Sequence, residues 1–165
     1  MTNNSLTHLK SDLEAQVKIR RQLHRYPEWK YCGFAELVLD LGQPMTAVPL
    51  PPYLDLGLPK YCYRNAQQLA FKHTTLTYVE GFALSSDDLP IAMPHAWLAN
   101  DKGEAIELTW EAPGTAYLGI PLETQWVKSF LKQRKCKDEL SIFNGNYLEE
   151  FSLLKDDIPQ EAIAS

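Results

Sequence analysis

The chain has 165 residues, 45% of them hydrophobic, with a net charge of −5 and an isoelectric point near 5.4. This length is enough for one domain with a real core and too short to suggest two. The acidic balance, without a stripe of Lys and Arg interleaved with aromatic residues, argues against a nucleic-acid-binding protein. No apolar stretch approaches the ~20 residues of a membrane span, and the polar start is unlike a signal peptide, so we expect a cytoplasmic protein without membrane contact.

The first part of the chain, residues 1–42, is expected to be helical. Apolar residues recur at helical spacing through residues 5–25, and a second helical pattern covers residues 34–41 before Gly42. Residues 43–60 follow as a proline-rich loop, because five prolines and a glycine argue against regular structure. The apolar residues between the prolines predict an ordered loop wrapped over the surface.

Residues 61–135 are expected to form the core of the domain. A helix is predicted to begin at or just before Cys62, after which the pattern changes to the alternation typical of strands. Strands are predicted over residues 75–84, 94–99, 104–110 and 116–120, a helix over 123–135 and a short last helix over 146–154. This order predicts an α+β fold, in which one domain (residues 1–155) packs the Cys62 helix on a small antiparallel sheet and carries an N-terminal helical extension. Residues 156–165 are predicted to be a flexible acidic tail.

The strands on either side of the turn at residues 100–103 carry a His and a Glu. Asn at the first turn position and Gly at the last suit a type I turn followed by a left-handed glycine bulge. In that register Trp97 lies opposite Glu107, and His95 shares its face with Glu107 at a diagonal position. A carboxylate within reach of an imidazole holds one tautomer and stabilises the imidazolium, as a general base requires. The prediction depends on the bulge at Gly103, because a plain two-residue turn would put the two side chains on opposite faces.

Three cysteines, none in a C-x-x-C arrangement, give no pattern for a disulfide framework or a zinc cluster, and we expect neither metal nor cofactor. Cys62 differs from the other two because the positive end of its helix and the free backbone N–H groups there favour a thiolate. Beside a protonated His it is a nucleophile, and its own N–H can donate to the oxyanion formed on acyl attack. Cys32 is interpreted as a packing residue and Cys136, flanked by lysines, as an exposed surface thiol.

Together these segments resemble the core of the transglutaminase-like branch of the papain-like cysteine enzyme superfamily. In that family a nucleophilic cysteine opens a helix, and strands carrying V-x-G-[YF], H-A-W and V-D-P-T motifs follow. Cys62 matches the nucleophile, "YVEGFA" the first strand, "HAW" at residues 95–97 the histidine motif, and "IELTW" the acid motif with Glu107 at the aspartate position. The resemblance covers roughly residues 60–110 and implies a papain/transglutaminase-like fold with a Cys-His-acid triad.

The chain departs from this family at several positions. Glutamate replaces the usual aspartate, which lengthens the arm by a methylene. The glutamine that papain-like enzymes place shortly before the cysteine has no counterpart, since position 56 is Leu56. The second oxyanion donor is therefore unassigned, with Tyr53 and Gln43 as candidates. "YCYRN" also resembles the cysteine segment of arylamine N-acetyltransferases, but their preceding arginine and paired glycines are absent.

The function we expect is that of a thiol-dependent acyl-transfer enzyme acting on an amide or ester of a protein or peptide. It is a peptidase or amidase if water resolves the acyl-enzyme, and a transglutaminase-type transferase if an amine does. The candidate substrate-binding residues are Trp97, Asn65, Trp110 and Tyr61; the two tryptophans can equally be core residues, and Asn65 can equally tie a loop. The alternative is a catalytically inactive fold that serves as a protein-binding or regulatory module. A metal site built from His24, His73 and His95 has no ligand spacing behind it, and nothing indicates an oligomeric state.

Overall fold

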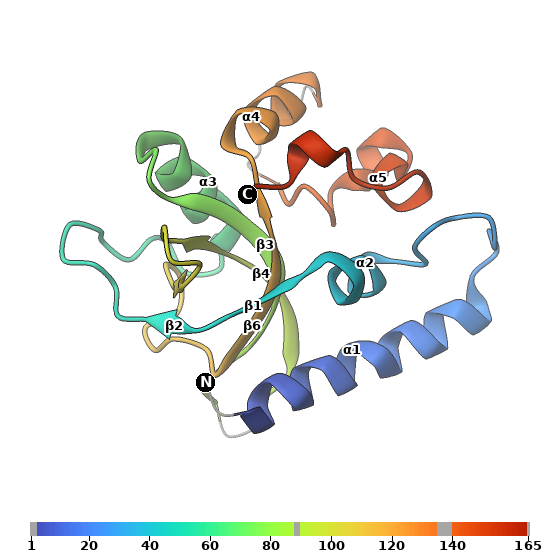
Figure 1. The fold of residues 1–165 in the computed structure, drawn as a ribbon, viewed down its shortest axis with the longest axis horizontal. Helices are drawn as coiled ribbons and strands as arrows, with labels where there is room; N and C mark the ends of the chain where they lie inside the picture. Colours follow the sequence, from blue (N-terminus) through green and yellow to red (C-terminus); the bar gives the residue numbers. More distant parts are fainter. Residues whose placement is uncertain (1–2, 88–89, 135–139, 165) are drawn as a thin grey trace.

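The computed structural model describes residues 3–87, 90–134 and 140–164. Its helices are α1 (Asn3–Leu23), α2 (Phe34–Leu41), α3 (Cys62–Lys72), α4 (Thr124–Gln133) and α5 (Ser152–Lys155), with two short 3-10 helices, η1 (Asn146–Glu149) and η2 (Gln160–Ala162). Its strands are β1 (Gln43–Met45), β2 (Ala47–Val48), β3 (Thr77–Leu84), β4 (Ala92–Ala99), β5 (Ala105–Ile106) and β6 (Ala116–Leu122). The predicted α+β class is confirmed, and the helices lie around one curled sheet (Figure 1).

The sheet closes on itself through a single segment of chain. Its strand order is β1-β6-β3-β4-β5-β2, and only Thr46 separates β1 from β2, so the two ends of the order are joined covalently. β1 pairs antiparallel with β6, whereas β2 pairs parallel with β5. The prediction of a loop without regular structure was therefore wrong for residues 43–48. Pro44 is tolerated there because β1 has a ladder on one side only, where a missing N–H is least costly.

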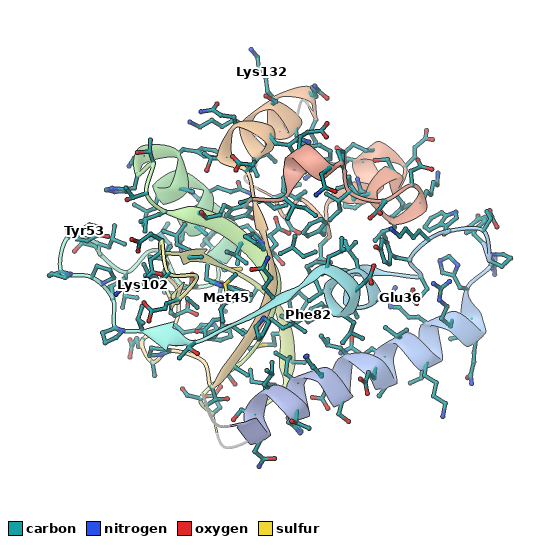
Figure 2. The ribbon with its side chains drawn as sticks, viewed as in Figure 1. Glu36, Met45, Tyr53, Phe82, Lys102 and Lys132 are labelled. Atoms are coloured by element: carbon teal, nitrogen blue, oxygen red, sulfur yellow. The ribbon has the colours of Figure 1, made fainter. Side chains whose placement is uncertain are left out.

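The closed sheet has an inside and an outside with different contents. The inside is filled by side chains that point away from the helices: Met45, Val79, Ala83, Trp97, Ala99, Ala105 and Tyr117. Figure 2 shows Met45 among the strands, and Tyr53 at the outer tip of the proline-rich loop. Gly119 leaves the room that the Trp97 ring occupies, because a Cβ there would lie 2.5 Å from that ring. The outside packs against the helices, which cover the larger part of the core.

The hairpin has the predicted turn. Gly103 has a φ of 72°, and the Asn100 N–H donates to the Glu104 carbonyl over 3.1 Å. Leu98 pairs with Ile106, which is the predicted register. The second strand is shorter than predicted, because the chain leaves the ladder after Ile106 instead of continuing to residue 110. The departure places the next residues in a turn that forms part of the candidate site.

The end of the described chain is ordered, contrary to the predicted flexible tail. Ile158 and Ala162 are buried, and Ile163 forms a bridge with Leu122 at the end of β6. The apolar residues of this segment outweigh its acidic composition, since they are buried beside the sheet.

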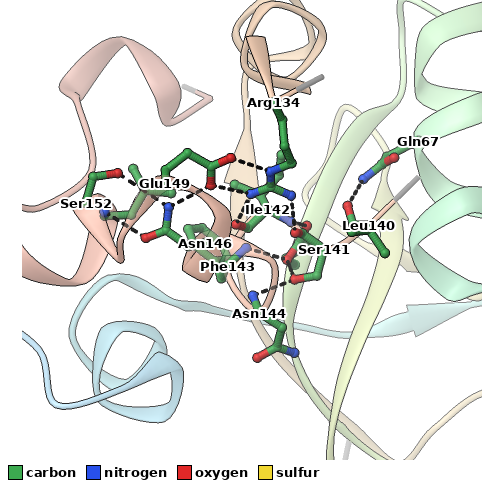
Figure 3. A network of polar contacts seen from close by, with 12 residues as sticks. Gln67, Arg134, Leu140, Ser141, Ile142, Phe143, Asn144, Asn146, Glu149 and Ser152 are labelled. Atoms are coloured by element: carbon green, nitrogen blue, oxygen red, sulfur yellow. Dashed lines mark hydrogen bonds and ion pairs between the residues drawn. The ribbon is translucent and has the colours of Figure 1, made fainter. Parts of the chain in front are cut away.

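Arg134, at the end of α4, pairs with Glu149 and donates to the carbonyls of residues 141 and 142, which fixes the chain there (Figure 3).

Candidate active site

Cys62 is the first residue of α3 and is buried, with 9% of its surface exposed. Its backbone N–H belongs to the first turn, where N–H groups have no partner within the helix. The residue two positions earlier, Lys60, has a positive φ of 69°. A non-glycine residue in this region is uncommon and costs energy, so the surrounding contacts must hold the turn that delivers Cys62.

Those contacts come from Asn65, one helical turn after the cysteine. Its side chain accepts from the Leu58 N–H over 3.1 Å and donates to the Leu58 carbonyl over 2.8 Å. It also donates to the Thr109 hydroxyl over 3.0 Å. Asn65 therefore has the loop-tying role, and it joins the loop before Cys62 to the turn after β5.

His95 lies in β4 opposite Gly81 and is 2% exposed. Its Nε2 lies 2.9 Å from Oε2 and 3.1 Å from Oε1 of Glu107, so the predicted hydrogen bond is present. With Nε2 occupied, Nδ1 is the ring nitrogen left for a second partner. The Cys62 thiol lies close enough to the imidazole to raise its pKa. One face of the ring is covered by Trp110, stacked at 4.1 Å and 10°.

The charge of His95 is set by opposing effects. Burial is the largest and lowers the pKa, because it disfavours the cation. The hydrogen bonds with Cys62 and Glu107 and the charges of these two groups together outweigh it and raise the pKa to about 9. The balance of these effects therefore favours the protonated imidazole at neutral pH.

Glu107 is held by more donors than the sequence suggested. Its Oε1 accepts from the backbone N–H groups of Leu108, Thr109 and Trp110, over 3.0, 2.8 and 3.1 Å. Its Oε2 accepts from the Tyr117 hydroxyl over 2.8 Å, in addition to His95. Burial opposes ionisation most strongly, but these donors and the charge of His95 lower the pKa of Glu107 below its usual value. The longer glutamate arm reaches its own following backbone, whose N–H groups form a concavity for an anion.

The four predicted substrate-binding residues have different surroundings. Trp97 is completely buried inside the sheet, where its Nε1 donates to the Met45 sulfur, so it presents no surface to a substrate. Asn65 is occupied by the contacts described above. Trp110 is partly exposed beside His95, and Tyr61 is 54% exposed directly before Cys62. Trp110 and Tyr61 alone are therefore placed to meet a substrate.

The two candidates for a second oxyanion donor lie elsewhere. The Tyr53 ring is 6.0 Å from that of His73, at the far end of α3 from Cys62. Gln43 is in β1, which β6 and β3 separate from the strand of His95. Neither side chain is placed to serve the Cys62 site.

Tyr117 belongs to the candidate site but is not among the site residues predicted from the sequence. It lies in β6, is fully buried, and uses its hydroxyl to join the Gly114 N–H to Glu107. The strand itself was predicted, but its distance from Glu107 depends on how the sheet closes. No local sequence signal reports that closure.

Comparison with protein-family models, curated proteins and solved structures gives no match for this chain. Function is therefore argued from the geometry of the Cys62, His95 and Glu107 site.

Two further findings concern metals and membranes. His24 bonds locally with Tyr26, and His73 ends α3, so neither joins His95. Within residues 3–87, 90–134 and 140–164, no cluster of three or more His, Cys, Asp or Glu side chains is arranged to hold a metal ion. No helix in the same ranges combines the length and the apolar character needed to cross a membrane. Cys136 lies outside the described residues.

Proposed function

We propose that this protein is a thiol-dependent acyl-transfer enzyme with a papain/transglutaminase-like core, acting on an amide or ester such as that of a protein or peptide. The observation that carries the proposal is the buried His95, which hydrogen-bonds to Glu107 and lies beside a cysteine at a helix N-terminus that raises the pKa of the ring. Nucleophile, base and orienting acid in this arrangement define a triad by geometry.

The proposed reaction has two steps. In the first, the Cys62 sulfur attacks the carbonyl carbon, the bond to the leaving amine or alcohol breaks, and His95 gives its proton to that leaving group. The Cys62 N–H donates to the oxygen on which negative charge develops. In the second, His95 takes a proton from water or an amine, which attacks the thioester and releases the acyl group with the thiol restored.

The proposed role of Glu107 also accounts for the hydrogen bonds that this carboxylate accepts. A carboxylate that holds a buried imidazolium must be ionised and fixed in direction. The three backbone N–H groups on Oε1 fix Glu107, and Oε2 is left to face the imidazole and Tyr117. The substitution of glutamate for aspartate is therefore compatible with the orienting role.

The proposal is tested by alkylation of Cys62 with iodoacetamide, followed by site-specific mass spectrometry. In the native protein we expect Cys62 to react at least about tenfold faster at neutral pH than glutathione, because a neighbouring imidazolium and a helix N-terminus generally make a thiol more reactive. His95→Ala should abolish the excess. Since His95 keeps its proton up to a pH of about 9, the difference between native protein and variant should narrow as the pH rises through that value.

The control in the same molecule is Cys32, which is buried and whose pKa burial raises to about 11. Its labelling should be slow and independent of His95. If Cys62 reacts no faster than glutathione and His95→Ala changes nothing in a variant that still unfolds cooperatively, the enzyme proposal fails. The inactive binding module would then be the better account.

A further inference from the structure

A groove of about 460 Å³ opens beside the triad. Most of its wall is apolar and comes from the closing segment of the sheet, the proline-rich loop and the loop after Glu107: Ala47, Val48, Pro49, Leu50, Leu56 and Pro113. The remaining wall is made by Trp110, Glu107 and Glu111. Because Trp110 also stacks on the His95 ring, one side chain separates the groove from the catalytic imidazole. The groove therefore adjoins the proposed reaction centre, which it meets at Trp110 and Glu107.

The charges of the wall restrict what the groove can hold. Glu107 and Glu111 are its ionisable residues, and none of the wall residues is Lys, Arg or His. Glu107 is ionised because its pKa is lowered. An occupant with a carboxylate or phosphate would lose hydration next to like charge, so an anionic group is disfavoured relative to an uncharged one.

The backbone of the groove wall favours an alkyl chain over a peptide as the occupant. A bound extended peptide needs free main-chain donors and acceptors. Pro49 and Pro113 have no N–H to offer to such a peptide. An alkyl chain needs no such partners and gains from burial alone.

We propose that this groove binds the uncharged aliphatic acyl chain of the substrate, with the scissile carbonyl at Cys62 and the leaving group outside the groove. The assignment rests on the proposed acyl-transfer function and narrows its substrate class.

The test uses 4-nitrophenyl esters of acetate, butyrate, hexanoate and octanoate, which share one leaving group, together with the octanoate analogue that carries a terminal carboxylate. The native protein is assayed below the concentrations at which the longer esters aggregate. Each methylene that the groove buries is expected to raise kcat/KM by up to about fourfold, so octanoate should exceed acetate by at least about tenfold. The terminal carboxylate should remove most of that gain.

Two matched variants locate the effect. Leu56 lines the groove and is 46% exposed, whereas Leu58 in the same loop is outside it and 53% exposed. Leu56→Asp is expected to abolish the preference for octanoate, while Leu58→Asp preserves it. Octanamide, which is uncharged, is then titrated into Cys62→Ala by calorimetry, with acetamide as the control.

The outcomes separate the two proposals. Hydrolysis of all esters at similar kcat/KM, or a chain-length preference unaffected by Leu56→Asp, overturns the groove assignment but leaves the enzyme. Binding of octanamide but not acetamide to Cys62→Ala, without hydrolysis of any ester by the native protein, supports the groove and overturns the enzyme. If octanamide does not bind to Cys62→Ala and the native protein hydrolyses no ester, both the groove assignment and the enzyme proposal are overturned.

Discussion

Glu80 and Glu107 are both buried glutamates, 0% and 3% exposed, the first within β3 and the second directly after β5. Glu80 is on β3 opposite Ala96, on the face of the sheet covered by helices. His95 directly precedes Ala96 and directs its ring to Glu107 on the other side of the sheet. The pKa of Glu80 is raised and that of Glu107 is lowered. Two carboxylates with similar burial thus have opposite preferences for the proton.

The difference comes from their partners. Glu80 accepts from the hydroxyls of Tyr78 and Ser141, over 2.5 and 2.6 Å, and from the N–H groups of Ile142 and Phe143, over 2.5 and 3.3 Å. All of these donors are neutral, and burial, the largest effect, prevails over them in raising the pKa. Glu107 has a similar set of donors and, in addition, His95.

The comparison separates a structural carboxylate from a functional one. Glu80 joins β3 to the segment after α4 through neutral donors, whereas Glu107 is coupled through the titratable ring of His95 to Cys62. Four predictions follow from this contrast.

The largest expected effect is on activity. Glu107→Gln keeps the size of the side chain but turns an acceptor facing His95 into an amide that can place a donor there. The imidazolium then loses its partner and the ring is driven to the wrong tautomer, so kcat/KM for ester hydrolysis should fall on the order of 10²–10⁴-fold. Glu80→Gln should leave kcat/KM within about threefold. Equal losses in the two folded variants would mean that Glu107 is also only structural.

For the free energy of unfolding, we expect the larger effect at Glu80 instead of Glu107. Glu80→Ala leaves four buried donors without their acceptor, and each unsatisfied group costs about 1–3 kcal/mol before relaxation. We expect a loss of about 3–5 kcal/mol in the free energy of unfolding, measured by urea denaturation. If the loss is below about 1 kcal/mol, water or other groups replace the carboxylate and Glu80 is not a structural clip.

The pH dependence of stability should have opposite signs for the two residues. Because the folded-state pKa of Glu80 is raised, the native protein loses stability from this group as the pH rises above the unfolded value of about 4.3. Because that of Glu107 is lowered, its contribution is fully present above about 4.3 and is lost as the pH falls through the folded pKa. Urea denaturation from pH about 3.5 to 6 should therefore show Glu80→Gln gaining on the native protein with rising pH, and Glu107→Gln falling behind it. Parallel curves would contradict the assigned shifts.

The sequence predicted the functional carboxylate but not the structural one, for a physical reason. His95 and Glu107 are brought together by a short hairpin, so Asn100 and Gly103 already determine their register. The start of α3 at Cys62 is likewise a local property. Three of the four donors to Glu80 come from more than 60 residues further along the chain, where no local pattern reports the pairing.

The same limit applies to the closed sheet. Residues 43–48 contribute strands because β5 and β6 are available to pair with them, although their own composition favours a loop. The ordered C-terminal segment has the same origin, since Ile163 becomes a strand-like partner through contact with Leu122. Tertiary pairing determines the structure of these segments, and it also brings Tyr117 close to Glu107.

The smallest expected effect distinguishes two tyrosines that donate to these carboxylates, Tyr117 to Glu107 and Tyr78 to Glu80. Tyr117→Phe and Tyr78→Phe each remove two hydrogen bonds of a buried hydroxyl, so both should cost about 1–3 kcal/mol of stability. Tyr117→Phe should also lower kcat/KM by about fivefold, because Oε2 of Glu107 loses the donor that helps to direct it at His95. It should shift the pH at which His95 titrates upward, since a carboxylate with one donor fewer interacts more strongly with the imidazolium, whereas Tyr78→Phe should leave both the rate and this pH unchanged. NMR titration of the His95 ring resonances with steady-state kinetics measures both, and identical behaviour of the two variants would reduce Tyr117 from a positioning residue to a packing one.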